Sequence, residues 1–136
     1  MLRETDVAYL AGLFDGEGSV YYKQTKQIRH KRPGKPTHNI WVIRMEIAMT
    51  DESIIRWVHD FTGCGSAGER KVRKGRKRQW RWRCAHRDAF YVARLIWPYV
   101  HVKLPKINQI INHYDGVLME GKVIDLKEYK QAMSLE

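Results

Sequence analysis

The chain reads Leu10-Ala11-Gly12-Leu13-Phe14-Asp15-Gly16-Glu17-Gly18 near its N-terminus, and this segment indicates more about the fold than any other. Within and just before it, Ala8, Gly12 and Gly16 are spaced four residues apart. A helix over the segment therefore carries them as one stripe of small side chains along a single face. Such a stripe lets the backbones of two helices approach each other closely.

Two carboxylates, Asp15 and Glu17, stand at the end of this predicted helix and are bracketed by glycines. The C-terminus of a helix carries partial negative charge, so carboxylates are unfavourable there unless something compensates them. A hard divalent cation such as Mg²⁺ would do so, because it takes carboxylate and backbone carbonyl oxygens as ligands and the glycines leave carbonyls accessible. The alternative is a capped turn with two solvated acids. The spacing alone favours neither.

Apolar periodicity, caps and turn residues predict the elements around this segment. The first helix is capped by Thr5 or Asp6 and ends at Gly16-Glu17-Gly18, and a second helix, capped by Thr50-Asp51, runs to residue 61. The other predicted elements are strands at 19–27 and 40–49 joined by a long basic loop, a hairpin with strands 66–73 and 79–84, and helices at 87–97, 103–120 and 123–135. Up to the third helix, the order is helix, strand, strand, helix, strand, strand, helix.

Alternation along the strands predicts a sheet with two chemically different faces. In the second strand one side carries Trp41, Ile43, Met45 and Ile47, and the other carries Val42, Arg44, Glu46 and Ala48. In the fourth strand Trp80 and Trp82 oppose Gln79, Arg81 and Arg83. This pattern is typical of an antiparallel sheet that covers a core with one face and presents a cationic face on the other side.

The composition points to a polyanionic partner. The 136 residues carry 25 Lys and Arg against 15 Asp and Glu, a formal net charge of +10 with a pI near 9.8. Lys and Arg that neutralise phosphates release condensed counterions, so nucleic acid is the first partner to consider, ahead of a membrane surface. The length supports one domain over residues 1–136, with a core at about 5–120 and a helical extension at about 121–136.

Hydropathy argues against a membrane protein and against a disordered tail. The apolar fraction is 43% and the mean hydropathy is −0.56. No apolar run approaches the roughly 20 residues of a spanning helix, and Glu4, Asp6 and Asp15 stand where a signal peptide would be free of acids. We therefore expect an intracellular protein, in the cytoplasm of a prokaryote or in an organelle.

The chain has two cysteines, Cys64 and Cys84, too few for a disulfide scaffold or a closed zinc site. We interpret them as small buried side chains. A disulfide between them is the alternative, because the second hairpin would bring the two near each other, although intracellular disulfides are rare.

The nine-residue segment closely resembles the signature of the LAGLIDADG homing endonucleases, nearly letter for letter. Residues 50–51 and 98–103, and the element order to about residue 120, also fit this family. The resemblance implies an α+β fold of the order αββαββα, in which a curved antiparallel sheet forms a saddle for DNA, with additional C-terminal helices. Because only one copy of the motif is present, it also implies a homodimer whose motif helices pack at a two-fold axis. The interface residues would be Ala8, Ala11, Gly12, Asp15 and Gly16.

The resemblance also assigns chemical roles. Glu17 stands at the position of the family's metal-binding acid, with the Gly16 carbonyl as a second ligand, and Asp15 is expected to cap or brace the partner helix. Lys103 matches a lysine that orders water and offsets charge at the scissile phosphate. Met49 occupies a position that is usually polar and often Gln, so that one solvent-ordering role is vacant or filled elsewhere. The implied cofactor is Mg²⁺ or Mn²⁺, with Ca²⁺ as a substitute that does not support cleavage.

Outward strand positions and basic loops form the predicted DNA surface. Arg and Lys can donate to guanine and Glu46 can accept from cytosine, so the strand face combines base readout with backbone positioning. The strand residues assigned to it are Ser19, Tyr21, Lys23, Thr25, Gln27, Arg44, Glu46, Lys71, Arg73, Arg81 and Arg83. The loop residues assigned to phosphates are Arg29, Lys31, Arg32, Lys35, Lys74, Arg76, Lys77 and Arg78, and Arg70 is a further expected DNA contact.

These features together predict a homodimeric, metal-dependent endonuclease that cuts both strands of a long, partly symmetric double-stranded DNA site. By analogy with the family, its gene lies in an intron or is a fragment of an intein. One alternative is a non-cleaving binder of the same fold, an RNA-splicing maturase or a transcription regulator; Met49 favours it, whereas Glu17 and Lys103 do not. Another is a basic RNA-binding structural protein such as a ribosomal one, which would explain the charge but not the motif.

Overall fold

The helices and strands follow the predicted order. The computed structural model describes residues 2–27 and 38–118. Its elements are α1 (Glu4–Glu17), β1 (Gly18–Gln27), β2 (His38–Met49), α2 (Glu52–Thr62), β3 (Ser66–Arg70), β4 (Gln79–Ala85), α3 (Arg87–Ile96) and α4 (Leu104–Leu118). The α+β prediction is confirmed. The basic loop with Arg29, Lys31, Arg32 and Lys35, and the helix predicted at 123–135, lie outside the described residues.

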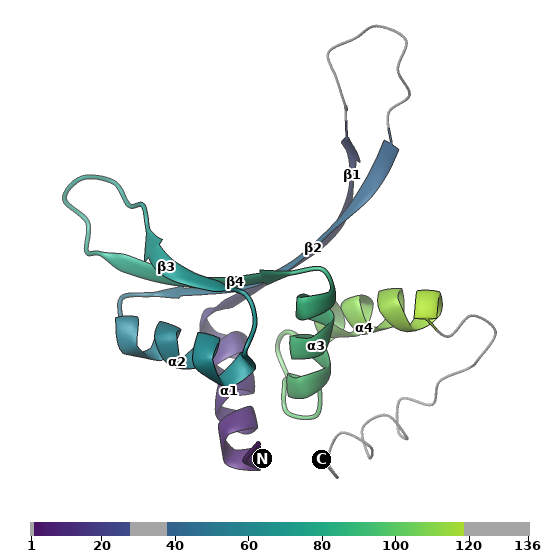
Figure 1. The fold of residues 1–136 in the computed structure, drawn as a ribbon, viewed down its shortest axis with the longest axis horizontal. Coiled ribbons are helices and arrows are strands. Elements are labelled where there is room, and N and C mark those ends of the chain that lie inside the picture. The colour runs from purple at the N-terminus through teal and green to yellow at the C-terminus, as the bar shows by residue number, and fades with distance from the viewer. Residues whose placement is uncertain (1, 28–37, 119–136) are drawn as a thin grey trace, which may run out of the picture.

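The strands form one antiparallel sheet in the order β1-β2-β4-β3. Figure 1 shows this sheet bent into a curved trough whose two hairpins, β1–β2 and β3–β4, rise on opposite sides. The helices lie beneath the trough, and no described helix covers its concave face. The curved antiparallel sheet expected for the saddle is therefore confirmed.

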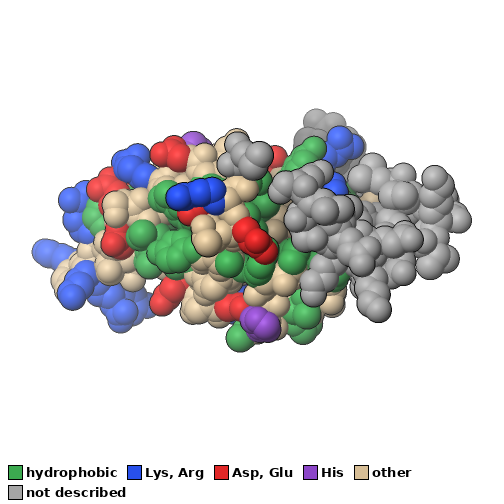
Figure 2. Space-filling view, turned by 90° about the horizontal axis from the view of Figure 1, so that it is seen from below, with side chains coloured by type: hydrophobic (Ala, Val, Ile, Leu, Met, Phe, Trp, Pro, Cys, Tyr) green, Lys and Arg blue, Asp and Glu red, His purple; other side chains and the backbone are tan. Residues whose placement is uncertain are grey.

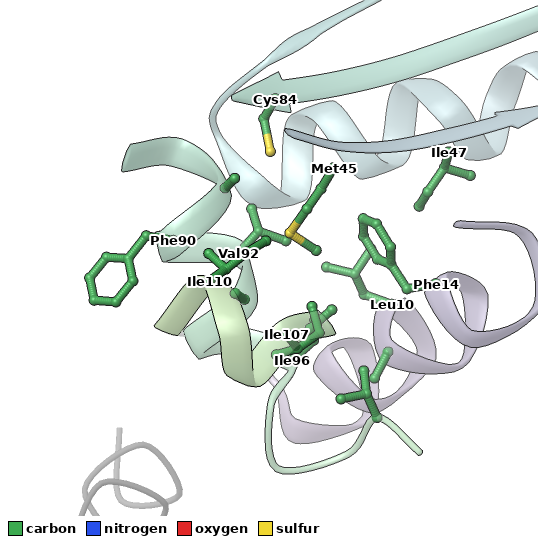
Figure 3. Packing of buried hydrophobic residues seen from close by; sticks show 14 of the residues in the cluster. Leu10, Phe14, Met45, Ile47, Cys84, Phe90, Val92, Ile96, Ile107 and Ile110 are labelled. Atoms are coloured by element: carbon green, nitrogen blue, oxygen red, sulfur yellow. The ribbon is translucent and has the colours of Figure 1, made fainter. Parts of the chain in front are cut away.

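The core lies between the convex face of the sheet and helices α1, α2, α3 and α4, and Figure 3 shows part of it. Leu10 and Phe14 from α1, Met45 from β2 and Ile96 from α3 are all fully buried there. The Phe14 ring meets Trp82 of β4 edge-on, with 5.9 Å between the ring centroids. Burial of each such side chain stabilises the fold by about 1.5–3 kcal/mol. Helix α1 is thus held against the sheet along one face.

A sharp corner joins α1 directly to β1 at Gly18. A Cβ at this position would touch the Phe14 ring and would lie 2.8 Å from the Phe14 carbonyl oxygen, closer than real Cβ contacts allow. Glycine is therefore required where the helix turns into the sheet. Glu17, the last residue of α1, consequently lies at the junction itself.

The helix ends follow their local sequence. The predicted cap of α2 is confirmed, since the Asp51 carboxylate accepts the backbone N–H of Ile54 at 3.1 Å, and Gly63 ends the helix in the left-handed region at φ 68°. The predicted cap of α1 at Thr5 or Asp6 is wrong by two or three residues: Arg3 holds the N-cap position without a side-chain cap, and Asp6 pairs with Arg3 at 3.0 Å instead. Among the helices of residues 2–27 and 38–118, none has both the length and the apolar character needed to cross a membrane.

Both cysteines are free thiols. Cys84 is buried and Cys64 is half-buried, and this burial raises the pKa of both thiols, so they stay protonated near neutral pH. The disulfide alternative is not realised, and the interpretation as a small buried side chain fits Cys84.

Candidate nucleic-acid interface and acidic site

Glu17 lies at the corner between α1 and the concave face of the sheet. Its side chain is exposed, and Ser19, two residues further on, is the first outward residue of β1. Within the part of the chain that the structure describes, no hydrogen bond or ion pair engages the Glu17 carboxylate. Its negative charge is therefore available to a ligand at the edge of an otherwise cationic surface.

Asp15 is engaged differently, although it is only two residues away. Its Oδ2 accepts the backbone N–H of His101 at 2.8 Å, and its Oδ1 accepts that of Lys103 at 3.0 Å. These two donors immediately precede α4, whose first N–H groups have no partner inside the helix. Asp15 thus braces α4 of its own chain and fixes the backbone of Lys103 beside the end of α1. The predicted contact of Asp15 with a partner helix stays a prediction.

The acidic end of α1 offers part of a metal site. The Glu17 carboxylate is unpaired, and carbonyls in the last turn of a helix, including that of Gly16, lack intrahelical partners. Both are hard oxygen donors of the kind that Mg²⁺ takes. Among the described residues no cluster of three or more His, Cys, Asp or Glu side chains could hold a metal ion. The donors fit a divalent cation, and its remaining ligands are not supplied by side-chain clusters of the described residues.

Strand register brings most of the predicted DNA-binding residues onto the concave face. Glu46 in the middle of the sheet pairs with Ser19 on β1 and with Arg83 on β4. The alternation around this rung gathers on one side Ser19, Tyr21, Lys23, Thr25, Arg44, Glu46, Arg70, Arg81 and Arg83. The opposite side carries the buried Ile43, Met45, Ile47 and Trp82. The side chain of Gln27 lies outside the described part of the structure.

Arg44 is held in place on this face. Its guanidinium carbon lies 4.6 Å from the centroid of the Tyr21 ring, a cation–π contact across the β1–β2 pair. Its Nε is buried and has no hydrogen-bond partner among the described residues. A buried N–H without an acceptor is unfavourable in the folded chain.

The turn between β3 and β4 forms a cationic hollow. The ladder ends at Arg70 rather than at residue 73 as predicted, because the chain enters a turn in which the Arg76 N–H donates to the Arg73 carbonyl at 3.1 Å. Lys71 and Arg73 are therefore loop residues and not strand residues. With Arg70, Arg76, Val72 and Gln79 they line a cavity of about 480 Å³. Four cations around one hollow suit a phosphate group.

Arg78 is turned toward the convex side of the β3–β4 hairpin, and its predicted contact with DNA stays a prediction. Its guanidinium forms a bidentate salt bridge with the Glu69 carboxylate, in which both N···O distances are 2.9 Å. The guanidinium carbon lies 5.1 Å from the centroid of the Trp80 ring. Glu69 and Trp80 are paired residues on the convex side of the β3–β4 ladder. Arg78 hydrogen bonds hold the pKa of Glu69 below its usual value, so this pair stays ionised at neutral pH.

One face of α1 is left uncovered by the residues that the structure describes. A Cβ added to Gly12 or Gly16 would meet nothing within 4 Å, and Tyr9 beside them is 48% exposed. Ala8 is half-buried. Ala11, however, is fully buried in the core, so its assignment to a dimer interface is wrong. The period of the helix explains this, since Ala11 lies on the buried side together with Val7, Leu10 and Phe14.

Charges are segregated over the molecule. Figure 2 views it from below, and there hydrophobic and acidic side chains are interspersed, while Lys and Arg gather at the end that carries the β3–β4 turn.

The structure also reveals residues that the sequence interpretation left without a role. Val42 and Ile40 share the concave face with the basic residues. The sequence signal that could have identified them is their alternation with Trp41 and Ile43, which places Ile40 and Val42 on the outward face of the strand.

Comparisons with solved structures give the fold a name. Neither a protein-family model nor a curated protein sequence matches this chain. The homing endonuclease I-TnaI is 17% identical, with a TM-score of 0.57 and coverage of 99% of both chains. I-CvuI, a homing endonuclease in complex with its target in the presence of 2 mM Ca, is 16% identical over 96% of this chain and 94% of that chain, with a TM-score of 0.58.

A third structure, the LAGLIDADG homing endonuclease I-LtrWI bound to target DNA, is 15% identical, with a TM-score of 0.62, and covers 99% of this chain and 44% of its own. At these identities the likeness establishes the fold. The chain therefore has the fold of the LAGLIDADG homing endonucleases, as its motif indicates.

Proposed function

We propose that this protein is a homodimeric, divalent-metal-dependent endonuclease that makes a double-strand break in a long, partly symmetric DNA site. The observation that carries the proposal is the unpaired Glu17 carboxylate at the edge of an open, cationic, concave sheet face. The solved structures of this fold include homing endonucleases in complex with DNA. By analogy the gene lies in an intron or inside an intein, and the enzyme acts within a prokaryotic cytoplasm or an organelle.

The homodimer is supported by the bare face of α1. Among the described residues, a Cβ built on Gly12 or Gly16 would meet nothing within 4 Å, so two copies of this face can bring their helix backbones close together. The same patch on both subunits gives an isologous, two-fold contact. Val102, 70% exposed in the segment that Asp15 braces, extends this face with apolar surface. A two-fold axis here would bring the two Glu17 residues near each other and supply the donors that one chain lacks.

The chemistry follows from the groups at this end of α1. Glu17 and the Gly16 carbonyl would hold Mg²⁺ or Mn²⁺, and Ca²⁺ would support binding without cleavage. Such an ion supplies a more acidic water and stabilisation for the leaving oxygen of the phosphodiester. Lys103, whose backbone N–H is bound by Asp15 at 3.0 Å, would offset the charge of the scissile phosphate. Asp15 acts through Lys103 as a positioning residue.

A non-cleaving binder of the same fold remains the second candidate, because of Met49. This residue is half-buried on the convex side of β2, opposite Trp80, and packs against the core. It cannot order water by hydrogen bonds as a polar residue there would. A protein without this role binds DNA or an RNA but cuts slowly or not at all.

Cleavage of DNA that carries the joined flanking exons tests the proposal. We expect the wild type with Mg²⁺ to make one double-strand break in this DNA, and Glu17→Gln to bind it without cutting. Glu52→Gln serves as the matched control, since Glu52 pairs with Arg56 on α2 at 2.8 Å, away from the motif. Tight binding without any cut by the wild type would support the non-cleaving candidate, and the absence of specific binding would rule out both.

A further inference from the structure

The concave face changes chemistry along its length. Nearest Glu17, the paired positions Ser19, Glu46 and Arg83, followed by Tyr21 and Arg44, are polar or charged. Further along the β1–β2 hairpin the same face carries Val42, paired with Lys23, and then Ile40, paired with Thr25. Two apolar side chains of the sheet thus face outward on the surface proposed to meet DNA.

These two side chains do not belong to the core. Ile40 is 36% exposed and Val42 is half-buried, whereas Ile43 and Met45 on the opposite side are 1% and 0% exposed. Neither Ile40 nor Val42 is part of the hydrophobic core cluster or of the residues packed against it. Their apolar surface is therefore open to a partner that lies in the trough.

The major groove of DNA displays one apolar group at its base edges, the C5-methyl of thymine. A β-branched aliphatic side chain that points into the groove can bury this methyl and gains nothing comparable from the other bases. The neighbouring Arg44, held by Tyr21 at 4.6 Å, is instead suited to the N7 and O6 acceptors of guanine.

The spacing sets where these contacts fall. Alternate residues of an antiparallel strand are about 6.8 Å apart, and successive base pairs rise by about 3.4 Å. Arg44, Val42 and Ile40 are consecutive outward residues of β2, so their targets are spaced about two base pairs apart. The direction is fixed as well, because Arg44 is the one nearest Glu17 along the hairpin.

Resting on the proposed function, the geometry points to Val42 and Ile40 as specificity-determining residues that each read one thymine methyl group. Each half of the target then contains two thymines about two base pairs apart, and a guanine about two base pairs closer to the cut. Either strand can present these bases.

The test is selection from a random duplex library with the full-length protein in Ca²⁺, followed by replacement of each enriched thymine with deoxyuridine, which lacks only the methyl group. We expect about a fourfold loss of affinity at each of the two positions, the value of one buried methyl group. Val42→Ala should remove the sensitivity at the position nearer the cut, and Ile40→Ala at the further one. Lys23→Ala, the matched control, should weaken binding to both duplexes equally.

The outcomes separate this inference from the proposed function. A selected sequence with no thymine pair at this spacing, or with no response to deoxyuridine, overturns the methyl readout and leaves the endonuclease proposal standing. A library that yields no enriched sequence overturns both. Thermal melting of the two alanine variants should match the wild type, because both side chains lie outside the core.

Discussion

Two acids two residues apart take different roles at the end of α1. Asp15 is occupied by two backbone N–H groups of its own chain, whereas Glu17 has no partner among the described residues. The sequence placed both carboxylates at the helix end and, through the family resemblance, assigned the metal to Glu17. It did not predict that Asp15 binds the segment before α4. The two donors, His101 and Lys103, follow Asp15 by 86 and 88 positions along the chain, too far for a local pattern to indicate the contact.

Asp15→Ala should weaken both the fold and the chemistry. Two backbone donors lose a charged acceptor, so the free energy of unfolding should fall by about 1–3 kcal/mol. Because Lys103 loses its anchor while the concave face stays intact, kcat should fall further than DNA affinity. Urea unfolding measures the first effect and cleavage kinetics the second.

Asp60→Ala is the control, since the Asp60 side chain is 84% exposed. The free energy of unfolding of this variant should differ from that of the wild type by less than about 0.5 kcal/mol. Equal losses in both variants would contradict the role of Asp15.

Gly18→Ala should destabilise the corner between α1 and β1. The added Cβ would lie 2.8 Å from the Phe14 carbonyl oxygen and 2.9 Å from the Phe14 Cα, and neither can move without shifting the helix. We expect a loss of about 1–3 kcal/mol in the free energy of unfolding, the usual range for overpacking. Gly68→Ala, on β3, is the control, because its Cβ would meet nothing within 4 Å. A thermal melt in which both variants behave alike would show that the corner tolerates a side chain.

At the scale of elements, the β3–β4 hairpin carries two kinds of basic residue: one that stabilises the hairpin and others that are exposed and expected to bind DNA. Arg78 lies between Glu69 and the Trp80 ring on the convex side, whereas Lys77 and Arg76 are exposed in the turn. Arg78→Ala should therefore speed amide hydrogen exchange across residues 66–85. Lys77→Ala should leave exchange unchanged but lower DNA affinity and reduce the slope of log affinity against log salt by about 1. If Arg78→Ala alters the salt slope as much as Lys77→Ala, Arg78 contacts phosphate after all.

The same pair gives the hairpin a dependence on pH. Arg78 lowers the pKa of Glu69 in the folded state, so the pair's contribution is present above the ordinary Glu value of 4.5 and is lost as pH falls through the lowered one. Relative to its intrinsic rate at each pH, hydrogen exchange in residues 66–85 should accelerate below about pH 4.5, and this loss of protection should be absent in Glu69→Gln. A profile that is identical in the two proteins would remove the ion pair as its cause.

Local sequence patterns predicted most helices and strands correctly. The features that they did not predict depend on contacts between residues far apart in the sequence. Alternation in the second and fourth strands, and the Asp51 cap, anticipated β2, β4 and α2 because each signal lies within a few residues. The end of β3 at Arg70 depends on where the partner strand begins, and the burial of Ala11 depends on which face of α1 meets the sheet. A count of basic residues likewise could not tell Arg78 from its neighbours, since the difference is the Glu69 carboxylate across the ladder.

At the scale of the whole molecule, charge and curvature act together. The strand cations lie on the concave face and the turn cations line the hollow at its end, while the face seen from below mixes acids with apolar surface (Figure 2). The net charge of +10 per chain becomes +20 in a dimer. DNA affinity should therefore fall steeply as salt rises, and the open face of α1 decides whether the two troughs are joined.

Gly12→Met tests the assembly directly. Nothing lies within 4 Å of the added Cβ, so the subunit should fold as before, and the helix should gain up to about 1 kcal/mol because glycine is unfavourable in its interior. A long side chain at this position keeps two α1 backbones apart, so sedimentation should change from two chains to one and double-strand cleavage should fall with it. Tyr91→Ala, 65% exposed on α3, is the control and should remain a dimer. A Gly12→Met protein that stays dimeric, or a wild type that is monomeric with and without DNA, would exclude this face of α1 as the subunit contact.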